Sequence, residues 1–255
     1  MRVSWWVVMC DLFAFSAATN FSAPKALPLF ASRASNNMDG WGIGYFRKGR
    51  ALVEKSAQRV HVPGRIHDSY QRLARVVSSM IIISHIRFRT SGPIDECHAH
   101  PFILRFCGSD WLFAHNGKAP AIEEYRTQGE GIAGAVSDSA RAFEYLRDQI
   151  VSLHRESAAP LPLFDLVWQG TARMIEEFPG GYNYLLSNGS VIFAFTNHRQ
   201  FMLLKGSRKL EGGLLLTTLE EGLSDENWLR MARSSSAQGL MLAVSGTDVV
   251  VQQSI

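Results

Sequence analysis

The sequence predicts a layered domain that combines helices and strands, of the α/β or α+β class. Two segments with helical spacing lie in the middle of the chain, and segments typical of strands lie on both sides of them. No internal repeat and no proline-rich linker divides the 255 residues, which are enough to bury a sizeable core. We therefore expect one domain over residues 10–255, preceded by a short extension, residues 1–9.

The first half of the chain predicts a hairpin, a helix and two strands. "DGWGIGYF" and "ALVEKS" are typical of two strands joined across "RKGR", a glycine-containing turn. The apolar residues of "RIHDSYQRLARVV" have helical spacing, and "SMIIISHIRF" then indicates a buried strand. "DWLFAHNG" predicts a short apolar strand that ends in a turn.

The second half predicts two helices followed by strands. "SDSARAFEYLRDQIVSLHRE" has Ser137 as a natural N-cap. One stripe of this helix carries Ala140, Phe143, Leu146, Ile150 and Leu153. "PLFDLVWQGTARMIEEF" predicts a second helix, ended by "PGG", and "YNYLLSNGSVIFAFTN" predicts a hairpin about an Asn-Gly turn. Further strands are expected in "QFMLLKG", "GLLLTTL" and "GLMLAVSGTDVVVQQ".

Composition limits the classes of partner. The formal net charge is only +3 and no long basic block is present, so we expect no nucleic-acid partner. No run of about 18 apolar residues predicts a membrane span. The three cysteines, Cys10, Cys97 and Cys107, form no CxxC pair, which favours a reducing compartment over a disulfide framework. We expect a cytoplasmic protein.

Cys10 is the candidate nucleophile. It follows Met9, and loss of residues 1–9, through a start at Met9 or through processing, would make Cys10 the N-terminal residue. Its α-amine, with a reference pKa of about 7.7–8.0, would then be a built-in base for the thiol. Two alternatives stay open. In the first, Cys10 is only a buried small residue of a first strand. In the second, the N-terminal stretch is a secretory signal, although Asp11 interrupts its apolar run.

Asn116 and Gly117 are candidate oxyanion donors. They end the apolar segment "FAHNG", where an Asn side-chain amide and a Gly backbone N–H could point at one oxygen. Asn-Gly is also a common turn, and Asn188-Gly189 is expected to serve as one in this chain.

Arg87 and Asp138 are candidates for binding a charged substrate. Arg87 and Arg89 alternate at the end of a strand rich in isoleucine, where Arg87 is suited to bind a carboxylate in bidentate fashion. Structural ion pairs at a sheet margin are the alternative. Asp138 lies in the first turn of a helix, where a carboxylate favours the helix dipole, and it could equally receive an ammonium group.

Histidine and cysteine residues near Pro101 raise the question of a metal. "CHAHPF" offers Cys97, His98 and His100, but a zinc site needs about four well-placed ligands, so we expect a loop that supports the pocket. The glycines of "DGWGIG" do not form a nucleotide fingerprint and favour close backbone packing. His85 and His115 could pair with a cysteine, although both lie on apolar strands, which is more typical of structural histidines. We expect neither a metal nor a cofactor.

Together these motifs resemble the class II glutamine amidotransferases, in particular small stand-alone bacterial members. Cys10 after Met9, "DGWGIG", "HIRFRTSG", "HAHPF", "FAHNG" and "SDSA" occur in the order typical of that family, over a span from Cys10 to about Asp138. The resemblance implies an α+β fold, specifically a four-layer αββα sandwich of the N-terminal nucleophile (Ntn) hydrolase type.

The resemblance also implies roles for individual residues. Cys10 would be the N-terminal nucleophile, with Asn116 and Gly117 as the oxyanion hole. Arg87 would hold the substrate α-carboxylate, with Thr90 nearby, and Asp138 would hold the α-ammonium. Larger members have Trp and His where this chain has Phe88 and Ser91, so the contacts of those two positions do not carry over.

Three functions are compatible with these residues. The first is a glutaminase that cleaves the γ-amide of glutamine through a Cys10 thioester and releases ammonia to a possible partner protein. The second is a hydrolase of γ-glutamyl amides or peptides without ammonia transfer. The third is a catalytically silent binding module of the same fold, with Cys10 blocked by the residues before it.

Overall fold

The structure, a computed structural model, describes residues 10–62, 64–157, 159 and 161–255. The predicted extension, residues 1–9, lies outside the described residues. The elements in chain order are β1 Asp11–Phe21, α1 Ala26–Arg33, β2 Trp41–Arg47, β3 Arg50–Ser56, β4 His61–Val62, β5 Arg65–Ile66, α2 Asp68–Val76, β6 Ser79–Ile86, β7 Phe102–Phe106, β8 Ser109–Lys118, the 3-10 helix η1 Pro120–Glu124, α3 Asp138–Glu156, α4 Leu163–Glu177, β9 Gly181–Ser187, β10 Ile192–Thr196, β11 Phe201–Lys205, β12 Leu214–Thr217, β13 Leu229–Met231, β14 Leu240–Ser245 and β15 Asp248–Ser254.

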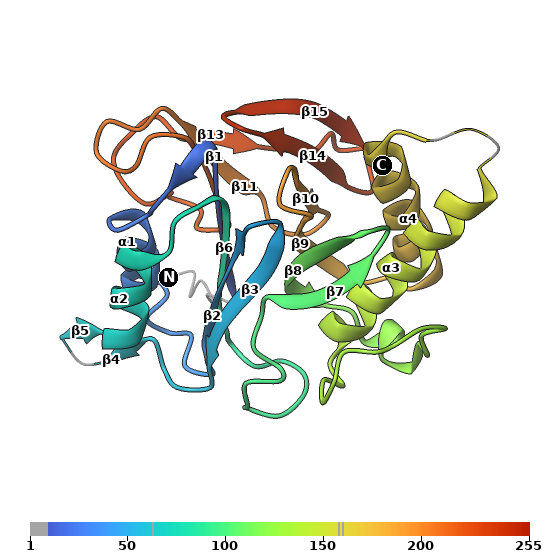
Figure 1. Ribbon diagram of the computed structural model, residues 1–255, viewed down its shortest axis with the longest axis horizontal. Coiled ribbons are helices and arrows are strands. Elements are labelled where there is room, and N and C mark those ends of the chain that lie inside the picture. Colours follow the sequence, from blue (N-terminus) through green and yellow to red (C-terminus); the bar gives the residue numbers. More distant parts are fainter. Residues whose placement is uncertain (1–9, 63, 158, 160) are drawn as a thin grey trace, which may run out of the picture.

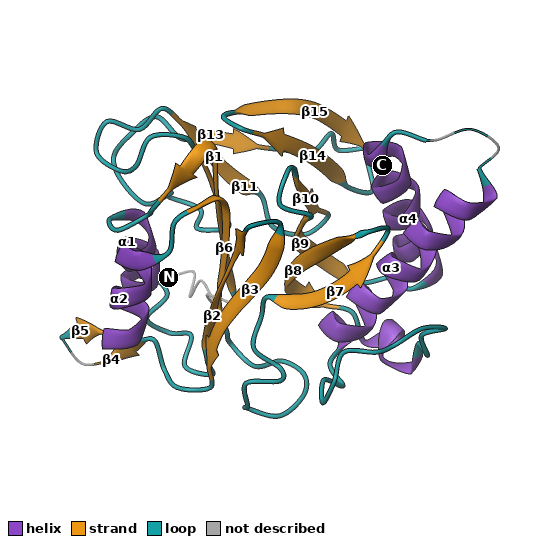
Figure 2. Cartoon of the chain, in the orientation of Figure 1, coloured by secondary structure: helices purple, strands orange, loops and turns teal. Residues whose placement is uncertain are grey.

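The chain forms four layers, two of helices outside and two of sheet inside (Figures 1 and 2). One large sheet has seven strands in the order β13-β11-β12-β1-β6-β2-β3, and the other has six in the order β15-β14-β10-β9-β8-β7, while β4 and β5 pair in a small two-stranded sheet. Helices α1 and α2 lie on the outer side of the first sheet, and α3 and α4 on the outer side of the second. The order of layers is therefore αββα.

Three apolar clusters hold these layers together, one at each boundary. The first joins α1 and α2 to the seven-stranded sheet through residues such as Phe13, Phe30 and Tyr70. The second lies between the two sheets and includes Leu12 and Leu185. The third packs α3 and α4 on the six-stranded sheet. Alternate residues of β1 therefore enter different clusters, as the period of two in a strand requires.

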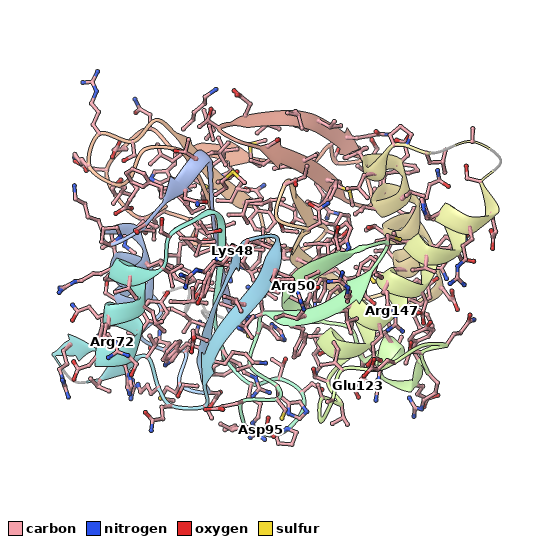
Figure 3. The ribbon with its side chains drawn as sticks, in the orientation of Figure 1. Lys48, Arg50, Arg72, Asp95, Glu123 and Arg147 are labelled. Atoms are coloured by element: carbon pink, nitrogen blue, oxygen red, sulfur yellow. The ribbon has the colours of Figure 1, made fainter. Side chains whose placement is uncertain are left out.

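The elements with strong local patterns are confirmed. β2 and β3 pair as a hairpin, and both residues of its turn, Lys48 and Gly49, have positive φ (Lys48 is labelled in Figure 3). Ser137 accepts a hydrogen bond from Ala140 N and begins α3, and all five residues of its predicted stripe are buried. β9 and β10 form the predicted hairpin around Asn188-Gly189.

Helix α1 was not predicted from the sequence. It has only eight residues, contains a proline and lacks a side-chain cap, so the usual start signals are missing. Glu211 replaces the cap from a distant part of the chain, because its carboxylate accepts from Lys25 N and Ala26 N. A tertiary contact thus caps the start of this helix.

Among the described residues, no helix is both long and apolar enough to cross a membrane.

Candidate active site

Cys10 lies directly before β1, in the middle of the seven-stranded sheet. β1 runs antiparallel to β6 with Asp11 opposite Ile86, so the start of β1 lies beside the end of β6. The Sγ atom is 3.2 Å from Phe88 N and 3.0 Å from Phe88 O. Burial raises the pKa of the Cys10 thiol to about 12, although the contact with the Phe88 backbone opposes this shift. At neutral pH the thiol needs a base to become nucleophilic.

Five of the six predicted site residues border one pocket. They come from four parts of the chain and are Cys10, Arg87, Thr90, Gly117 and Asp138. The sixth, Asn116, lies directly behind the nucleophile, because its Nδ2 atom donates to the carbonyl oxygen of Cys10. The structure thus brings all six together, while their chemical roles stay predictions.

Asn116 and Gly117 lie within a strand. β8 continues to Lys118, with Asn116 opposite Asn183 and Gly117 opposite Tyr182 of β9, so the expectation of a turn at this Asn-Gly is wrong. Gly117 has φ +154°, and a Cβ there would collide with the carbonyl oxygen of Gly181. The absence of a side chain at Gly117 is therefore required by the close approach of β9.

The Asn116 side chain keeps unused hydrogen-bonding capacity. The side chain is buried, and its Oδ1 atom has no partner. An amide NH₂ has two hydrogens, and the bond to Cys10 O uses one of them. One N–H of Asn116 therefore remains beyond this bond.

Arg87 is buried, and its guanidinium also supports the loop that follows. Nη1 donates to Pro93 O at 2.7 Å and Nη2 donates to Ser91 O at 2.9 Å. β6 ends at Ile86, so the predicted strand ends before Arg87, and Arg89 is exposed while Arg87 is not. A guanidinium has five N–H donors, so three remain beyond these two bonds. Arg87 can hold its loop and still offer a positive charge to the pocket.

The segment from Thr90 to His100 has no helix or strand and supports the pocket, as expected for "CHAHPF". Thr90 itself is exposed at the pocket border. Buried His98 donates from Nδ1 to Asp95 at 2.7 Å and accepts at Nε2 from Val136 N at 3.1 Å (Asp95 is labelled in Figure 3). His98 thus links this loop to the residues just before α3. In the described part of the chain, no cluster of three or more His, Cys, Asp or Glu residues suits a metal ion.

Asp138 is buried at the first position of α3. Its Oδ1 accepts from Ser139 N at 2.8 Å, and its Oδ2 accepts from Ala119 N at 3.0 Å. These bonds fix the carboxylate between the end of β8 and the start of α3. The helix dipole adds further support for its negative charge.

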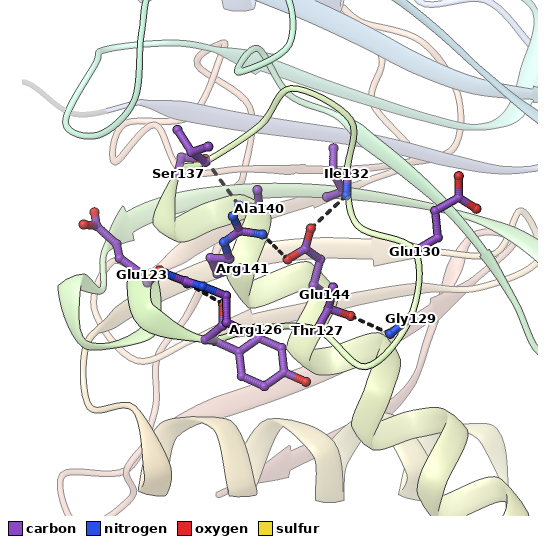
Figure 4. Close-up of polar contacts among 12 residues, drawn as sticks. Glu123, Arg126, Thr127, Gly129, Glu130, Ile132, Ser137, Ala140, Arg141 and Glu144 are labelled. Atoms are coloured by element: carbon purple, nitrogen blue, oxygen red, sulfur yellow. Dashed lines mark hydrogen bonds and ion pairs between the residues drawn. The ribbon is translucent and has the colours of Figure 1, made fainter.

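The loop before Asp138 is anchored on α3 by Glu144, a buried carboxylate that also pairs with Arg141 of the same helix (Figure 4). Glu144 is fully buried, and it accepts from Ile132 N at 2.8 Å and from Arg141 Nη1 at 2.6 Å. Ser91 of the neighbouring loop donates to Glu123 at 2.8 Å. The loop that carries Thr90 and the loop that precedes Asp138 are therefore both tied to the η1–α3 region.

His115 of β8 joins this strand to the start of α3. Its Nδ1 lies 2.8 Å from Ser139 Oγ and its Nε2 lies 3.2 Å from Gly181 O. Burial lowers the pKa of His115, while the charge of Asp138 opposes this shift. The neutral tautomer with the proton on Nε2 satisfies both contacts, which matches the predicted structural histidine. We see no contact between His115 and Cys10 Sγ that would form a dyad.

One residue of the site was missed by the sequence reasoning. Arg199, in the connection between β10 and β11, donates from Nη1 to Cys10 O at 3.1 Å, across 189 residues of sequence. No local pattern identifies it, because "TNHRQF" resembles an ordinary loop between strands.

The four layers, with Cys10 directly before a central strand, define an Ntn-type fold. Residues 9–209 match the family of class-II glutamine amidotransferases, and the chain belongs to that family.

Similar proteins agree with this assignment. A Haemophilus influenzae protein named "Putative glutamine amidotransferase" is 26% identical over 190 residues, which cover 73% of this chain and 63% of that protein. An uncharacterized protein of Methanocaldococcus jannaschii is 26% identical over 198 residues, covering 75% of this chain and 52% of its own length. The chain therefore spans less than two thirds of either curated relative.

Solved structures confirm the fold. A Pseudomonas aeruginosa protein described as a predicted glutamine amidotransferase superposes with a TM-score of 0.64 at 18% identity, covering 95% of this chain and all of that one. The glutamine phosphoribosylpyrophosphate amidotransferase of B. subtilis superposes with a TM-score of 0.63 at 15% identity, covering 96% of this chain and 49% of that one. The predicted αββα sandwich of the Ntn type is confirmed.

Proposed function

We propose that this protein hydrolyses the γ-amide of glutamine, or of a related γ-glutamyl compound, through a thioester on Cys10. One observation carries the proposal. The Cys10 thiol borders a pocket that also holds a buried cation, Arg87, and a buried carboxylate, Asp138. A glutamyl head carries the complementary carboxylate and ammonium on one carbon. Arg87 would pair with the carboxylate and Asp138 with the ammonium, and these two charge-assisted contacts would fix the orientation of the head in the pocket.

The chemistry requires Cys10 to be the first residue of the active protein. Its free α-amine then takes the thiol proton, directly or through a water, and Sγ attacks the γ-carbonyl carbon. The oxyanion of the tetrahedral intermediate is held by the second N–H of Asn116 and by Gly117 N–H. The leaving amine takes the proton as the C–N bond breaks. Water then hydrolyses the thioester, which releases glutamate and restores the thiol.

The fate of the released amine distinguishes two versions of this function. A glutaminase would supply ammonia to a partner protein, whereas a γ-glutamyl hydrolase would act on amides or peptides with larger leaving groups. Thr90 is exposed at the pocket border, which supports access from solvent and so is compatible with either leaving group.

The test compares two forms of the protein, one expressed from Met1 and one that begins at Cys10, with intact mass to establish the first residue. Glutamate release is measured from L-glutamine and from a γ-glutamyl dipeptide. We expect turnover from the form that begins at Cys10 and none from its Cys10→Ala variant. Absence of turnover of either substrate by the Cys10 form would refute the proposal and favour a silent binding module.

A further inference from the structure

Arg199 is held rigidly by the six-stranded sheet. Its backbone N–H donates to Asn183 Oδ1 at 3.0 Å, and its carbonyl accepts from Asn183 Nδ2 at 2.6 Å. Thr196 Oγ1 donates to the same carbonyl. Asn183 is fully buried on β9. The main chain of residue 199 is therefore fixed, although it lies outside any helix or strand.

The guanidinium of Arg199 reaches the other sheet. Nη1 donates to Cys10 O at 3.1 Å and lies 3.3 Å from Asp11 Oδ1, while Nη2 donates to Thr218 O at 2.7 Å. The Asp11 carboxylate is itself held by Asn37 Nδ2 at 2.9 Å. Arg199 thus ties the start of β1 to the end of β12, and ties both to the neighbouring sheet.

Two donors converge on the carbonyl oxygen of Cys10, one from Asn116 and one from Arg199. An N-terminal residue has only one peptide bond, so this carbonyl group is its sole covalent anchor. Fixing the oxygen fixes the plane of the Cys10–Asp11 peptide and the position of the Cys10 Cα, and so limits the region that Sγ and the α-amine can reach. It also fixes the Asn116 amide, whose second N–H is the oxyanion donor proposed above.

We propose that Arg199 is a positioning residue for the N-terminal nucleophile. It acts through the carbonyl of Cys10, which it holds together with Asn116, and makes no contact with the substrate. Arg199 is not among the residues that line the pocket. This inference rests on the proposed function, because it assigns a role in the same reaction.

The test is steady-state kinetics of the protein that begins at Cys10, with the better of L-glutamine and the γ-glutamyl dipeptide. Arg199→Gln should lower kcat by about 10- to 100-fold, since misplacement of a reacting group by about 1 Å can cost a factor of this order. KM should change by less than about threefold, because Arg199 does not touch the pocket. Arg208→Gln, which changes an exposed arginine, is the matched control and should keep the parent kcat.

Loss of Arg199 also leaves the buried Asp11 carboxylate without its cation, which could unfold the protein and imitate a catalytic defect. The double variant Arg199→Gln/Asp11→Asn removes both charges. We expect it to unfold at a temperature close to that of the parent and to keep the low kcat. Recovery of kcat to within about threefold of the parent would overturn the inference, because Arg199 would then only neutralise Asp11.

Arg199→Lys separates charge from geometry. A lysine ammonium keeps the charge beside Asp11 but lacks the planar fork that reaches Cys10 O and Thr218 O together. Its kcat should lie between those of the parent and Arg199→Gln. A kcat equal to that of the parent would refute positioning by the planar guanidinium.

Failure of this inference can be told apart from failure of the proposed function. If the parent itself turns over neither substrate, the proposed function fails. If the parent is active and Arg199→Gln is equally active, only the role of Arg199 is refuted.

Discussion

Asn116→Ala separates catalysis from stability more sharply than other changes at the site. The substitution removes the proposed oxyanion donor, and loss of such a donor typically costs about 10²- to 10³-fold in kcat, or about 2.7–4 kcal/mol of transition-state stabilisation. Folding should suffer far less. Cys10 O keeps its bond from Arg199, and the buried Asn116 Oδ1 has no partner to lose.

The expected cost to folding is that of one hydrogen bond and a small loss of packing, about 1–2 kcal/mol. For a chain of this length that corresponds to a fall of roughly 2–8 °C in Tm. The assay is glutamate release by the protein that begins at Cys10, with Tm measured by circular dichroism in the same buffer. The two measurements should therefore disagree, with a large loss in kcat and a small loss in Tm.

Asn188→Ala provides the matched control. Asn188 belongs to the other Asn-Gly pair and accepts from Ser190 N and Val191 N in the β9–β10 turn. Its loss should lower Tm by a similar amount and leave kcat unchanged. A loss of kcat in Asn116→Ala smaller than about threefold, with Tm as expected, would refute the reasoning, because the oxyanion would then be held elsewhere.

The remaining predictions concern three residues of the same pocket. Arg87→Ala should raise KM by about 10- to 100-fold, because the lost charge-assisted hydrogen bond contributes about 1.5–3 kcal/mol to binding. An unchanged KM in the glutamate-release assay would show that Arg87 does not bind the substrate. In protein that keeps residues before Cys10, the thiol pKa of about 12 leaves the neutral form dominant at pH 7. Alkylation of Cys10 by iodoacetamide, followed by peptide mapping, should therefore speed up about tenfold per pH unit up to that pKa, because only the thiolate reacts; a plateau below pH 9 would contradict this. Gly117→Ala should abolish turnover and lower Tm by more than Asn188→Ala does, since the new Cβ would collide with Gly181 O; a Tm equal to that of the parent would show that β9 can move aside.

Elements with a complete local pattern could be predicted from the sequence. Helix α3 follows from the spacing of its apolar residues and from the Ser137 cap, both of which act within a few residues. The β2–β3 hairpin likewise follows from its turn. Helix α1 could not be predicted, because its backbone donors are satisfied by Glu211, far away in sequence.

The Asn116-Gly117 pair shows how tertiary structure overrides a local preference. Taken alone, Asn-Gly favours a turn, and the pair at Asn188-Gly189 does lie in one. At residue 116 the chain instead continues as a strand, because β9 offers backbone partners as far as Lys118. The role of Asn116 and Gly117 in the candidate site was nevertheless predicted, because it depended on residue types and on family resemblance and not on the turn.

Much of the candidate site is a consequence of strand register. Because β1 and β6 are antiparallel with Asp11 opposite Ile86, the residue before β1 must lie beside the residue after β6. Cys10 and Arg87 are therefore neighbours although 76 residues separate them. A correct pairing of these two strands would have been enough to place Cys10 beside Arg87.

The second half of the site depends on contact between the two sheets, which no pairing within one sheet can give. Asn116 belongs to β8 of the six-stranded sheet, and it meets Cys10 only where the two sheets approach each other. Arg199 lies at the same junction, held by Asn183 on one side and by Cys10 and Thr218 on the other. The residues that hold the Cys10 carbonyl thus also connect the sheets. Changes that loosen this junction, even far from the pocket, should therefore lower kcat before they affect KM, since the proposed substrate contacts, Arg87 and Asp138, lie within the pocket itself.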